Sequence, residues 1–425
     1  MPETKKNIVI AGGGFGGILA AVYLDKGLKK NPAIAKNYQL ILINNHHLHL
    51  YTPALYEIAS IPQGKHNLEY VKSSITIPLI EIFEHRNVEW REETIISIDR
   101  TKKELAFQSG KALPYEYLIL ALGSETSYFN IPGAKEHGLP LKTFADAVHL
   151  RDAIENGLMS GTSHLDIVVA GAGASGVEVA AEFENFVSSI QKIGQACQVT
   201  VSLVEGSPEI LPGFDAWVVQ KAKKRLESLG VKIITNALIT QVDKTMIRFK
   251  NGSTRPYTIL VWAGGVKAAS VLASMGIQLS PKGGAPINQF LEVGRSIFAV
   301  GDSAAFIHPK TGKPLPWNVP IAEAQAKTAA ANIIREISGK PKLPFRPKIK
   351  YPFILAVGET YAIADLNLFH LAGFSAWILK QAIELKYLLT ILPFFQAIPT
   401  WLKFMAVARS NDVRMSTKTQ SPQAN

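Results

Sequence analysis

Two glycine triplets have the spacing of a backbone turn that binds phosphate. They are Gly12, Gly14 and Gly17, and Gly171, Gly173 and Gly176. In the pattern G-x-G-x-x-G the first glycine permits a tight turn and the second lets a pyrophosphate approach the backbone. The third glycine allows a helix to pack closely on a strand, and the N–H groups at the start of that helix face the phosphates. Each triplet therefore predicts a dinucleotide site.

The residues that follow the next apolar strand predict which nucleotide each site prefers. After residues 199–204 comes Glu205, whose carboxylate is suited to accept hydrogen bonds from a ribose diol and to repel a 2′-phosphate. No arginine follows in residues 206–208. The second site is therefore predicted to favour NADH over NADPH. At the first site, residues 40–43 end in Asn44 and Asn45, whose amides can still bond a ribose hydroxyl.

The elements around both triplets predict the fold. Each triplet follows a short apolar run of β type and precedes a run of helix-forming residues, and a second apolar strand comes next. The runs are residues 7–11 and 18–24 at the first triplet, and residues 166–170 and 177–183 at the second. This order is typical of parallel β-α-β units. We expect an α/β protein with two Rossmann-like dinucleotide-binding domains, one inserted in the other.

Composition excludes several other classes. A chain of 425 residues suits two or three domains, and its net charge of +11 is compatible with anionic cofactors or an anionic membrane surface. No nucleic-acid motif accompanies the charge. Cys197 is the only cysteine, which excludes a disulfide within the chain. The apolar stretch 8–24 contains five glycines, and no apolar run reaches 18 residues, so we expect neither a signal peptide nor a spanning helix.

Further strings make the assignment more specific. Residues 117–124, 260–266 and 297–302 resemble the strand-and-turn segments of flavoproteins with two dinucleotide-binding domains. Within that superfamily the chain resembles the type II NADH dehydrogenases, the single-subunit NADH:quinone oxidoreductases. The resemblance is carried by Tyr51–Ala59, Gly173–Glu178, Val204–Pro208 with Ile210–Pro212, and Trp262–Lys267, and it runs from about residue 6 to about residue 410.

The resemblance implies an enzyme that passes a hydride from NADH to a noncovalent FAD and then electrons to a membrane quinone, without pumping protons. The FAD-binding residues that it implies are Gly12, Gly13, Gly14, Phe15, Gly16, Gly17, Asn44, Asn45, Pro53, Ile95, Gly123, Asp302, Val319, Pro320 and Ile321. Those for NADH are Gly171, Gly173, Ser175, Gly176, Glu178, Glu205 and Gly264, and those for quinone are Pro320 and Gln325.

Glu178 is the predicted catalytic residue. Its position one turn into a dinucleotide-binding helix would also suit an ordinary solvated carboxylate. In the family the matching glutamate faces nicotinamide and flavin, which implies orientation of NADH or proton handling. A helix beginning near Ile321 is expected to direct its positive end toward the flavin. The family usually has an Ala-Gln pair at that helix start, whereas this chain has Val319 and Pro320.

Alternative functions are distinguished by a few features. A sulfide:quinone or disulfide reductase needs at least two redox cysteines, which this chain lacks. A ferredoxin- or rubredoxin-reductase-like enzyme would be soluble, and a redox sensor would bind nucleotides without turnover. His46, His47 and His49 alternate sides in an extended chain and have no acidic or thiol partner at ligand spacing, so we expect a polar turn near the flavin edge rather than a metal site.

The predicted organisation has three parts. The FAD domain comprises residues 1–161 and 290–345, the NADH domain comprises residues 162–289, and a C-terminal segment with a polar tail comprises residues 346–425. In the helix-like stretch 377–389 the apolar residues repeat every three or four positions, and Lys380 and Glu384 lie largely elsewhere. With nine basic and four acidic residues, the segment is predicted to lie in a membrane interface on the cytoplasmic face of the cell membrane. A homodimer interface or packing on the body is the alternative.

Overall fold

The computed structural model describes residues 5–191 and 197–410, which divide into two compact units. Unit 1 comprises the described residues up to His49, Ile77–Glu125 and Val266–Tyr351. Unit 2 comprises Leu50–Thr76, Thr126–Gly265 and the chain from Pro352 onward. The domain boundaries predicted at residues 161, 289 and 345 separate parts that bind different ligands, whereas the two units are separated by compactness. Those boundaries therefore stay a prediction. Four short strands occur where the chain passes between units: β3 (Leu48–Leu50), β4 (Thr76–Pro78), β10 (Ser124–Thr126) and β19 (Val266–Ala268).

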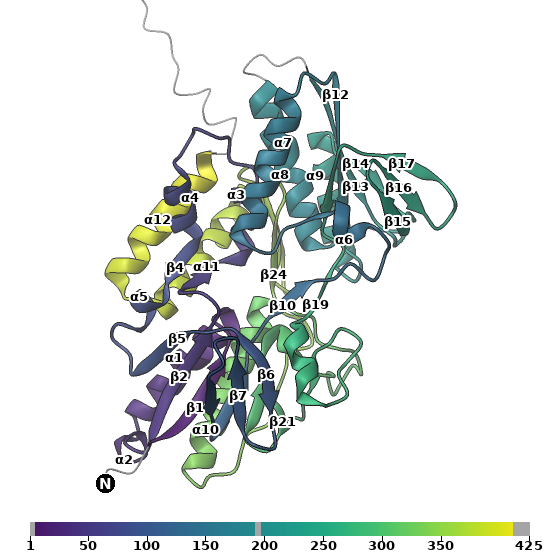
Figure 1. Cartoon of the computed structure of the whole chain (residues 1–425). Coiled ribbons are helices and arrows are strands. Elements are labelled where there is room, and N and C mark those ends of the chain that lie inside the picture. The colour runs from purple at the N-terminus through teal and green to yellow at the C-terminus, as the bar shows by residue number, and fades with distance from the viewer. Residues whose placement is uncertain (1–4, 192–196, 411–425) are drawn as a thin grey trace, which may run out of the picture. The chain divides into compact units, whose positions relative to one another are not determined.

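Unit 1 is built on a six-stranded sheet. In spatial order its strands are β21 (Glu292–Gly294), β22 (Ile297–Ala299), β9 (Tyr117–Leu120), β1 (Lys6–Ala11), β2 (Tyr38–Asn44) and β5 (Val88–Glu92). All neighbours are parallel except the edge pair β21–β22. The helices α1 (Phe15–Lys29) and α10 (Val319–Ile337) pack together beside this sheet (Figure 1). They approach so closely that a Cβ on Gly27 would stand 2.8 Å from Cγ1 of Ile334.

A smaller layer covers the other face of the same sheet. It consists of the antiparallel strands β6 (Ile95–Asp99), β7 (Glu104–Phe107) and β8 (Ala112–Pro114) and the 3-10 helix η2 (Ser270–Met275). Val9 and Ile41 share a hydrophobic core with this layer. Ile8 and Leu40 are equally buried and, as alternate residues of their strands, point to the face where α1 lies. The remaining elements of unit 1 are α2 (Pro32–Ala35), α5 (Leu79–Phe83), β20 (Ala285–Pro286), η3 (Gly301–Ser303) and β23 (Ala304–Ala305).

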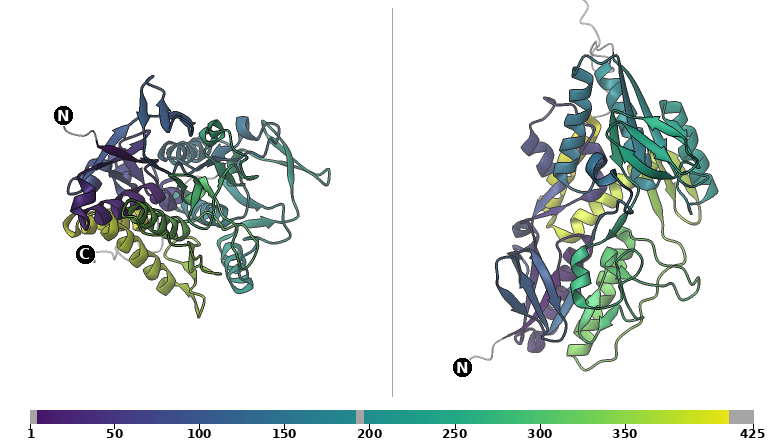
Figure 2. Two further views of the ribbon diagram at one scale, coloured as in Figure 1. Left: turned by 90° about the horizontal axis from the view of Figure 1, so that it is seen from below. Right: turned by 45° about the vertical axis from the view of Figure 1, so that its right-hand side comes forward.

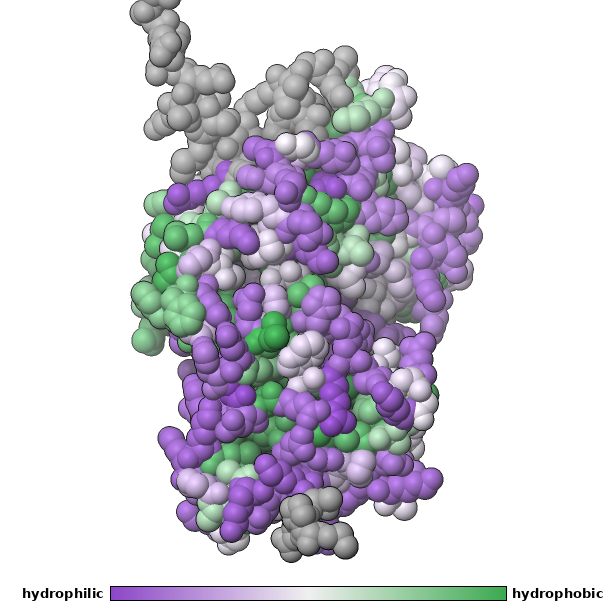
Figure 3. Space-filling model, turned by 60° about the vertical axis from the view of Figure 1, so that its left-hand side comes forward, coloured by the Kyte–Doolittle hydropathy of each residue, from purple (hydrophilic) through white to green (hydrophobic). Residues whose placement is uncertain are grey.

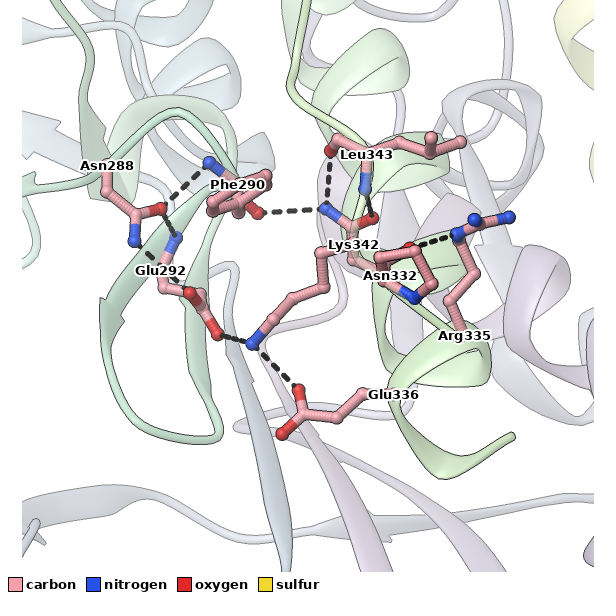
Figure 4. Close-up of polar contacts among 9 residues, drawn as sticks. Asn288, Phe290, Glu292, Asn332, Arg335, Glu336, Lys342 and Leu343 are labelled. Carbon is pink, nitrogen blue, oxygen red and sulfur yellow. Dashed lines mark hydrogen bonds and ion pairs between the residues drawn. The ribbon is translucent and has the colours of Figure 1, made fainter. Parts of the chain in front are cut away.

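A buried asparagine fixes the end of α10. The Nδ2 of Asn332 donates to the carbonyl oxygens of Phe290 at 3.2 Å and Leu343 at 2.9 Å, and its Oδ1 accepts from the Leu343 N–H at 2.8 Å. Beside it, the Lys342 ammonium pairs with Glu292 and with Glu336, as Figure 4 shows. The helix is therefore joined to the segment that directly follows it and to the region of Phe290, which lies 42 residues before Asn332.

Unit 2 contains a second parallel sheet. Its strands, in spatial order, are β11 (Leu139–Pro140), β18 (Ile259–Trp262), β12 (His164–Ala170), β13 (Gln198–Val204) and β14 (Lys232–Ile234). Around it lie α7 (Phe144–Met159), α8 (Ala174–Gln191) and α9 (Ala216–Leu229), which Figures 1 and 2 show from three directions. An antiparallel sheet of β15 (Ile239–Asp243), β16 (Met246–Phe249) and β17 (Thr254–Pro256) shares a core with β12 and β18. The two parallel sheets confirm the predicted fold class.

The C-terminal segment begins with a sheet that the sequence analysis did not predict. Strands β24 (Phe353–Ala356), β25 (Ala362–Asp365) and β26 (His370–Gly373) are antiparallel and lead into α11 (Phe374–Ile391) and α12 (Phe394–Ser410). The two helices run side by side in Figure 2, and α12 also packs against α4 (Leu68–Ile75). The remaining elements of unit 2 are η1 (Thr52–Ala54), α3 (Leu55–Ile58) and α6 (Ala134–His137). Among the described helices, none is long and apolar enough to cross a membrane.

Candidate functional site

The first glycine turn joins β1 to α1 in unit 1, as the triplet predicts. Gly12 has φ of +111°, and a Cβ there would stand 2.2 Å from the carbonyl oxygen of Ala121. A Cβ on Gly17 would stand 1.8 Å from the carbonyl oxygen of Gly12, so only glycine fits at either position. Gly14 differs, because no atom lies within 4 Å of where its Cβ would be. The turn is therefore rigid at two glycines and open at the third, where a pyrophosphate needs room.

The second turn, between β12 and α8 in unit 2, repeats this geometry. Gly171 has φ of +101°, and a Cβ on Gly176 would stand 1.8 Å from the Gly171 carbonyl oxygen. Gly173 faces open space within 4 Å, as Gly14 does. Ser175 is exposed beside it in the first turn of α8. The two turns are thus equivalent in backbone conformation, close approach and free space.

The residue at the end of the second strand supports each turn. Asn44, the last residue of β2, accepts a hydrogen bond on Oδ1 from the Gly13 N–H at 2.9 Å, and its Nδ2 donates to the His46 carbonyl at 2.7 Å. Glu205, directly after β13, accepts from the N–H groups of Ala172 and Ser207, each at 2.8 Å. Both side chains are therefore positioned by backbone N–H groups of the glycine turn or its neighbourhood.

His49, one of the three histidines expected to form a polar turn near the flavin, also holds the first glycine turn. His49 is fully buried, and burial lowers its pKa to about 4, so the ring is neutral at physiological pH. Its Nδ1–H therefore donates to the Gly13 carbonyl at 2.9 Å. The ring of Phe15 meets that of His49 edge to face, with centroids 5.2 Å apart. His49 is the central residue of β3, and its neighbours Leu48 and Leu50 are only partly buried. The alternation of side chains in a short strand could have indicated that His49 points inward.

A second group of predicted flavin residues lies together in unit 1. Asp302, in η3, accepts a hydrogen bond from the Ser124 hydroxyl, next to Gly123, which has φ of +70°. Gln325 is buried in α10 and its Oε1 accepts from the Gly301 N–H at 2.8 Å. The structure therefore joins the start of α10 to the turn that carries Asp302, and the assignment of Gln325 to quinone stays a prediction.

The start of α10 agrees with the expected helix. Asn318 caps it by accepting from the Ile321 N–H at 3.0 Å, and the first helical residues are Val319 and Pro320. A proline is tolerated there because the first N–H groups of a helix have no partner within it. The start of α10 is thus fixed by its own cap, in the same unit as the first glycine turn.

The remaining predicted residues make no side-chain hydrogen bond to the glycine turns among the described contacts. Asn45 is exposed, Ile95 begins β6, and Gly16 is buried in the first turn of α1. Pro53 belongs to unit 2, in η1. Gly264 is exposed in the turn after β18, where a Cβ would meet the Trp262 ring at 3.3 Å.

Glu178, the predicted catalytic residue, belongs to a cluster of charged side chains in unit 2. Burial raises the pKa of the Glu178 carboxyl to about 8, against the attraction of Lys380 and a hydrogen bond from the Ala356 backbone. One turn further along α8, burial likewise raises the pKa of Glu182 to about 8. Carboxyl groups with such pKa values hold or release a proton near neutral pH, which is what general acid–base chemistry needs.

Lys380 is the positive centre of this cluster. Its Nζ lies 2.7 Å from Oε1 of Glu384 and 3.3 Å from Oε1 of Glu57, which also accepts from the Tyr56 hydroxyl at 2.9 Å. Burial raises the pKa of Glu384 to about 7, while its carboxylate neighbours raise the pKa of Lys380. Lys380 thus pairs directly with Glu57 and Glu384, and its charge also attracts the carboxyl groups of Glu178 and Glu182. A buried charge set of this kind is typical of functional sites.

The burial of Lys380 and Glu384 corrects the helical pattern expected for residues 377–389. Lys380 is only 8% exposed and Glu384 only 3%, whereas Ile378, Ile383 and Leu389 of the same helix are exposed. The expectation that the two charges lie away from a packed apolar face was wrong, because Lys380 pairs with both Glu57 and Glu384 inside the unit. An acidic and a basic residue four positions apart in an apolar helix could have indicated an internal pair.

Comparison with known proteins identifies the family. The model of the pyridine nucleotide-disulphide oxidoreductase family matches residues 6–326, three quarters of the chain. The chain belongs to this family. This pyridine nucleotide-disulphide oxidoreductase has Cys197 as its only cysteine, which leaves no cysteine pair within the chain for a redox disulfide.

Individual relatives narrow the likeness. A type II NADH:quinone oxidoreductase of Haemophilus influenzae is 27% identical over 382 residues, which cover 80% of this chain and 83% of that protein. Demethylphylloquinone reductase NdbB of Synechocystis is 24% identical, over 91% of this chain and 93% of its own. The structure of NDH2 from Plasmodium falciparum in complex with NADH has the same fold, with a TM-score of 0.79 at 18% identity over 95% of this oxidoreductase and 98% of that chain. The predicted likeness to type II NADH dehydrogenases is confirmed.

Proposed function

We propose that this protein is an NADH:quinone oxidoreductase that binds FAD at the first glycine turn and NADH at the second. The observation that carries the proposal is Glu205, whose carboxylate is fixed beside the open Gly173 turn in a chain that resembles type II NADH:quinone oxidoreductases along most of its length. The proposed boundaries are residues 1–161 and 290–345 for FAD, 162–289 for NADH and 346–425 for the membrane.

The residues at the first turn fit FAD. Gly14 leaves open space for the pyrophosphate, and no side chain caps the start of α1, so its first N–H groups remain available to phosphate oxygens. Asn44 is positioned for the adenosine ribose, and Asp302 is proposed to bond the ribityl chain. When bound, FAD supplies a group that can take two electrons together from NADH and release them to another acceptor.

The residues at the second turn fit NADH. Gly173 leaves room for the pyrophosphate, and Glu205 presents carboxylate oxygens where a 2′-phosphate would be repelled. Glu178 is proposed to orient the nicotinamide and to hold a proton, because its raised pKa keeps the carboxyl protonated through pH 7. Reduction of a quinone to a quinol consumes two protons as well as two electrons. The Glu178–Glu182–Lys380 cluster is suited to hold protons for that step.

The C-terminal helices are proposed to lie in a membrane interface. Exposed large hydrophobic side chains gather on α11, on α12 and in the loop before β26: Leu368, Phe369, Phe374, Ile378, Ile383, Leu389, Phe394, Phe395 and Leu402. Figure 3 shows hydrophobic side chains grouped along one edge of the molecular face, at the height of these helices in Figure 1. An apolar face of this size marks an interaction surface, and a quinone is dissolved in lipid. We propose the cytoplasmic face of the cell membrane as its location; a homodimer is the alternative use of this surface.

A spectroscopic titration of the purified protein tests the whole assignment. Oxidised FAD should give its absorption bands, NADH should bleach them without added protein, and a short-chain quinone should restore them. NADH consumption with quinone in steady state distinguishes an enzyme from a nucleotide-binding sensor. Bleaching that only a ferredoxin or rubredoxin reverses would replace the quinone reductase with a soluble NADH-dependent reductase.

A further inference from the structure

A group of three metal-ligating side chains lies in unit 2, away from both glycine turns in sequence. Asp215 is the residue before α9, Asp365 ends β25, and His370 begins β26. Their ligand atoms all lie within 4.8 Å of one another, and within residues 5–191 and 197–410 this is the only such group of three or more. We propose that these three side chains form a binding site for a divalent transition-metal cation of the Zn²⁺ class.

The spacing of the three side chains suits an ion between them. The His370 Nε2 stands 3.6 Å from Oδ1 of Asp365 and 3.9 Å from Oδ1 of Asp215. Both separations exceed a hydrogen bond, yet two ligands each about 2.1 Å from one zinc ion stand up to about 4.2 Å apart. An ion can therefore contact all three atoms with little movement of the side chains. Imidazole with carboxylates is a ligand set that Zn²⁺, Mn²⁺ and Co²⁺ accept.

The surroundings hold the ligands in place before any ion binds. The His370 ring stacks on the Trp217 indole, with centroids 4.6 Å apart and planes 25° apart, which directs Nε2 toward the carboxylates. Asp215 accepts a hydrogen bond on Oδ1 from the backbone N–H of Trp217 at 3.0 Å. Asp365 accepts one on Oδ1 from the backbone N–H of Asn367, also at 3.0 Å. Asp365 is only 3% exposed. Preorganised ligands and oriented second contacts are what metal sites require.

The ion would join elements far apart in sequence. Asp215 precedes α9, which lies beside the parallel sheet of unit 2, and the other two ligands belong to the hairpin that leads into α11. Its effect is therefore to fasten the C-terminal segment within unit 2.

Metal titration of the full-length protein tests the site. After chelation and removal of the chelator, Zn²⁺ should bind one equivalent per chain in calorimetry and raise the unfolding temperature with increasing concentration. Co²⁺ should give visible absorption bands that Zn²⁺ removes. His370→Gln and Asp365→Asn should each weaken Zn²⁺ at least about tenfold, since even indirect contacts of a metal site are worth that much.

A matched histidine provides the control. His164 stands 3.2 Å from Asp166 as a simple pair in the same unit, so His164→Gln should leave Zn²⁺ affinity unchanged. The zinc-free unfolding temperature of each variant separates lost binding from damaged folding, and a variant that folds normally but shows no zinc-induced rise supports the site. No binding by the unaltered protein, or equal binding by His370→Gln, would reduce the group to an ordinary ion pair. Neither result depends on NADH or quinone, so the proposed oxidoreductase activity is judged separately.

Discussion

Asn44 and Glu205 hold equivalent positions in the two units. Asn44 ends the second strand of its β-α-β unit, and Glu205 directly follows the second strand of the other. Each accepts a hydrogen bond from the N–H one residue after the first glycine, on Gly13 and on Ala172. The two side chains differ in charge. The first turn thus receives a neutral amide and the second a carboxylate, which assigns the selection against a 2′-phosphate to the second site.

The charge of Glu205 should decide between NADH and NADPH. Glu205→Gln removes the charge that repels a 2′-phosphate. It also places an amide nitrogen opposite the backbone N–H of either Ala172 or Ser207. The preference for NADH should therefore fall by roughly 1–3 kcal/mol. The ratio of kcat/KM for the two nucleotides measures this. Asn44→Asp is the control at the equivalent position and should leave the ratio unchanged. Equal kcat/KM for both nucleotides in the unaltered protein would contradict the assignment.

One noncovalent FAD per chain should depend on the open space at Gly14. The Cβ of Gly14→Val would have no atom within 4 Å, so the protein should fold and lose most of its flavin. Gly294, which also faces open space, lies in β21, and Gly294→Val should retain the flavin. The ratio of flavin to protein absorbance reports both. Full flavin content in Gly14→Val would show that the pyrophosphate lies elsewhere.

Glu178 should matter for turnover more than for folding. Glu178→Gln keeps the volume and removes the titratable proton, so kcat with NADH and quinone should fall roughly tenfold or more, while flavin content stays. Glu184→Gln is a close control, because burial raises the pKa of Glu184 on the same helix to about 7. Stopped-flow reduction of FAD and its reoxidation by quinone locate the slow step. If both variants retain normal turnover, Glu178 is a structural carboxyl.

The pH dependence of stability should report Glu182. Burial raises its pKa from 4.5 to about 8, so the folded state keeps a proton that the unfolded chain has lost within this window. Stability contributed by this group therefore falls as the pH rises from about 4.5 to 8. Glu182→Gln removes the effect, and its stability relative to the unaltered protein should grow by up to about 1.4 kcal/mol per pH unit. Urea unfolding at pH 5, 6.5 and 8 measures the difference; parallel pH profiles would contradict the raised pKa.

Membrane binding is better tested by surface substitutions than by deleting the tail. Removal of residues from about 366 onward would also remove Phe404 and Val407, which belong to the core that contains α3 and α8. The triple change Phe394→Ser, Phe395→Ser and Leu402→Gln alters exposed side chains only and should reduce sedimentation with anionic vesicles several-fold. Leu238→Gln is the control, because Leu238 is also exposed but lies between β14 and β15, outside the C-terminal segment. Unchanged sedimentation with a loss of dimers would favour the homodimer.

The anchoring of α10 gives a stability prediction with an internal comparison. Asn332→Leu leaves the backbone groups of Phe290 and Leu343 without their partner, which should lower the free energy of unfolding by roughly 2–5 kcal/mol. Lys342→Met removes the neighbouring ion pairs, which are partly exposed, and should lower it by no more than about 1 kcal/mol (Figure 4). Denaturant unfolding compares the two. A larger loss in Lys342→Met would assign the anchoring to charge.

Local patterns predict the nucleotide sites because a glycine turn needs specific residues at fixed spacing. Gly12, Gly17, Gly171 and Gly176 are required by contacts within a few residues of the turn or with one neighbouring strand, and Glu205 follows the strand directly. The charge cluster is different. Glu57, Glu182 and Lys380 meet only through the tertiary fold, across 323 residues between the first and the last. Hydrophobic periodicity placed Lys380 outside the packed face, because periodicity does not register a buried ion pair.

The C-terminal sheet shows a second limit. Strands β24, β25 and β26 are short, and β25 has no polar alternation because it is buried on both faces. The group of Asp215, Asp365 and His370 was missed for another reason. The hairpin pairs Asp365 with His370, but Asp215 lies far from both in the sequence and meets them only in the folded protein.

The pairing of Lys380 with Glu57 also governs when unit 2 can finish folding during synthesis. Glu57 leaves the ribosome 323 residues before Lys380, which at typical rates of elongation is roughly 15–65 s. Until Lys380 emerges, α3, and later α8, lack the helix whose ammonium group pairs with Glu57. The nascent chain therefore holds an incomplete hydrophobic core until its last helices emerge, and it is during this interval that chaperones would bind it.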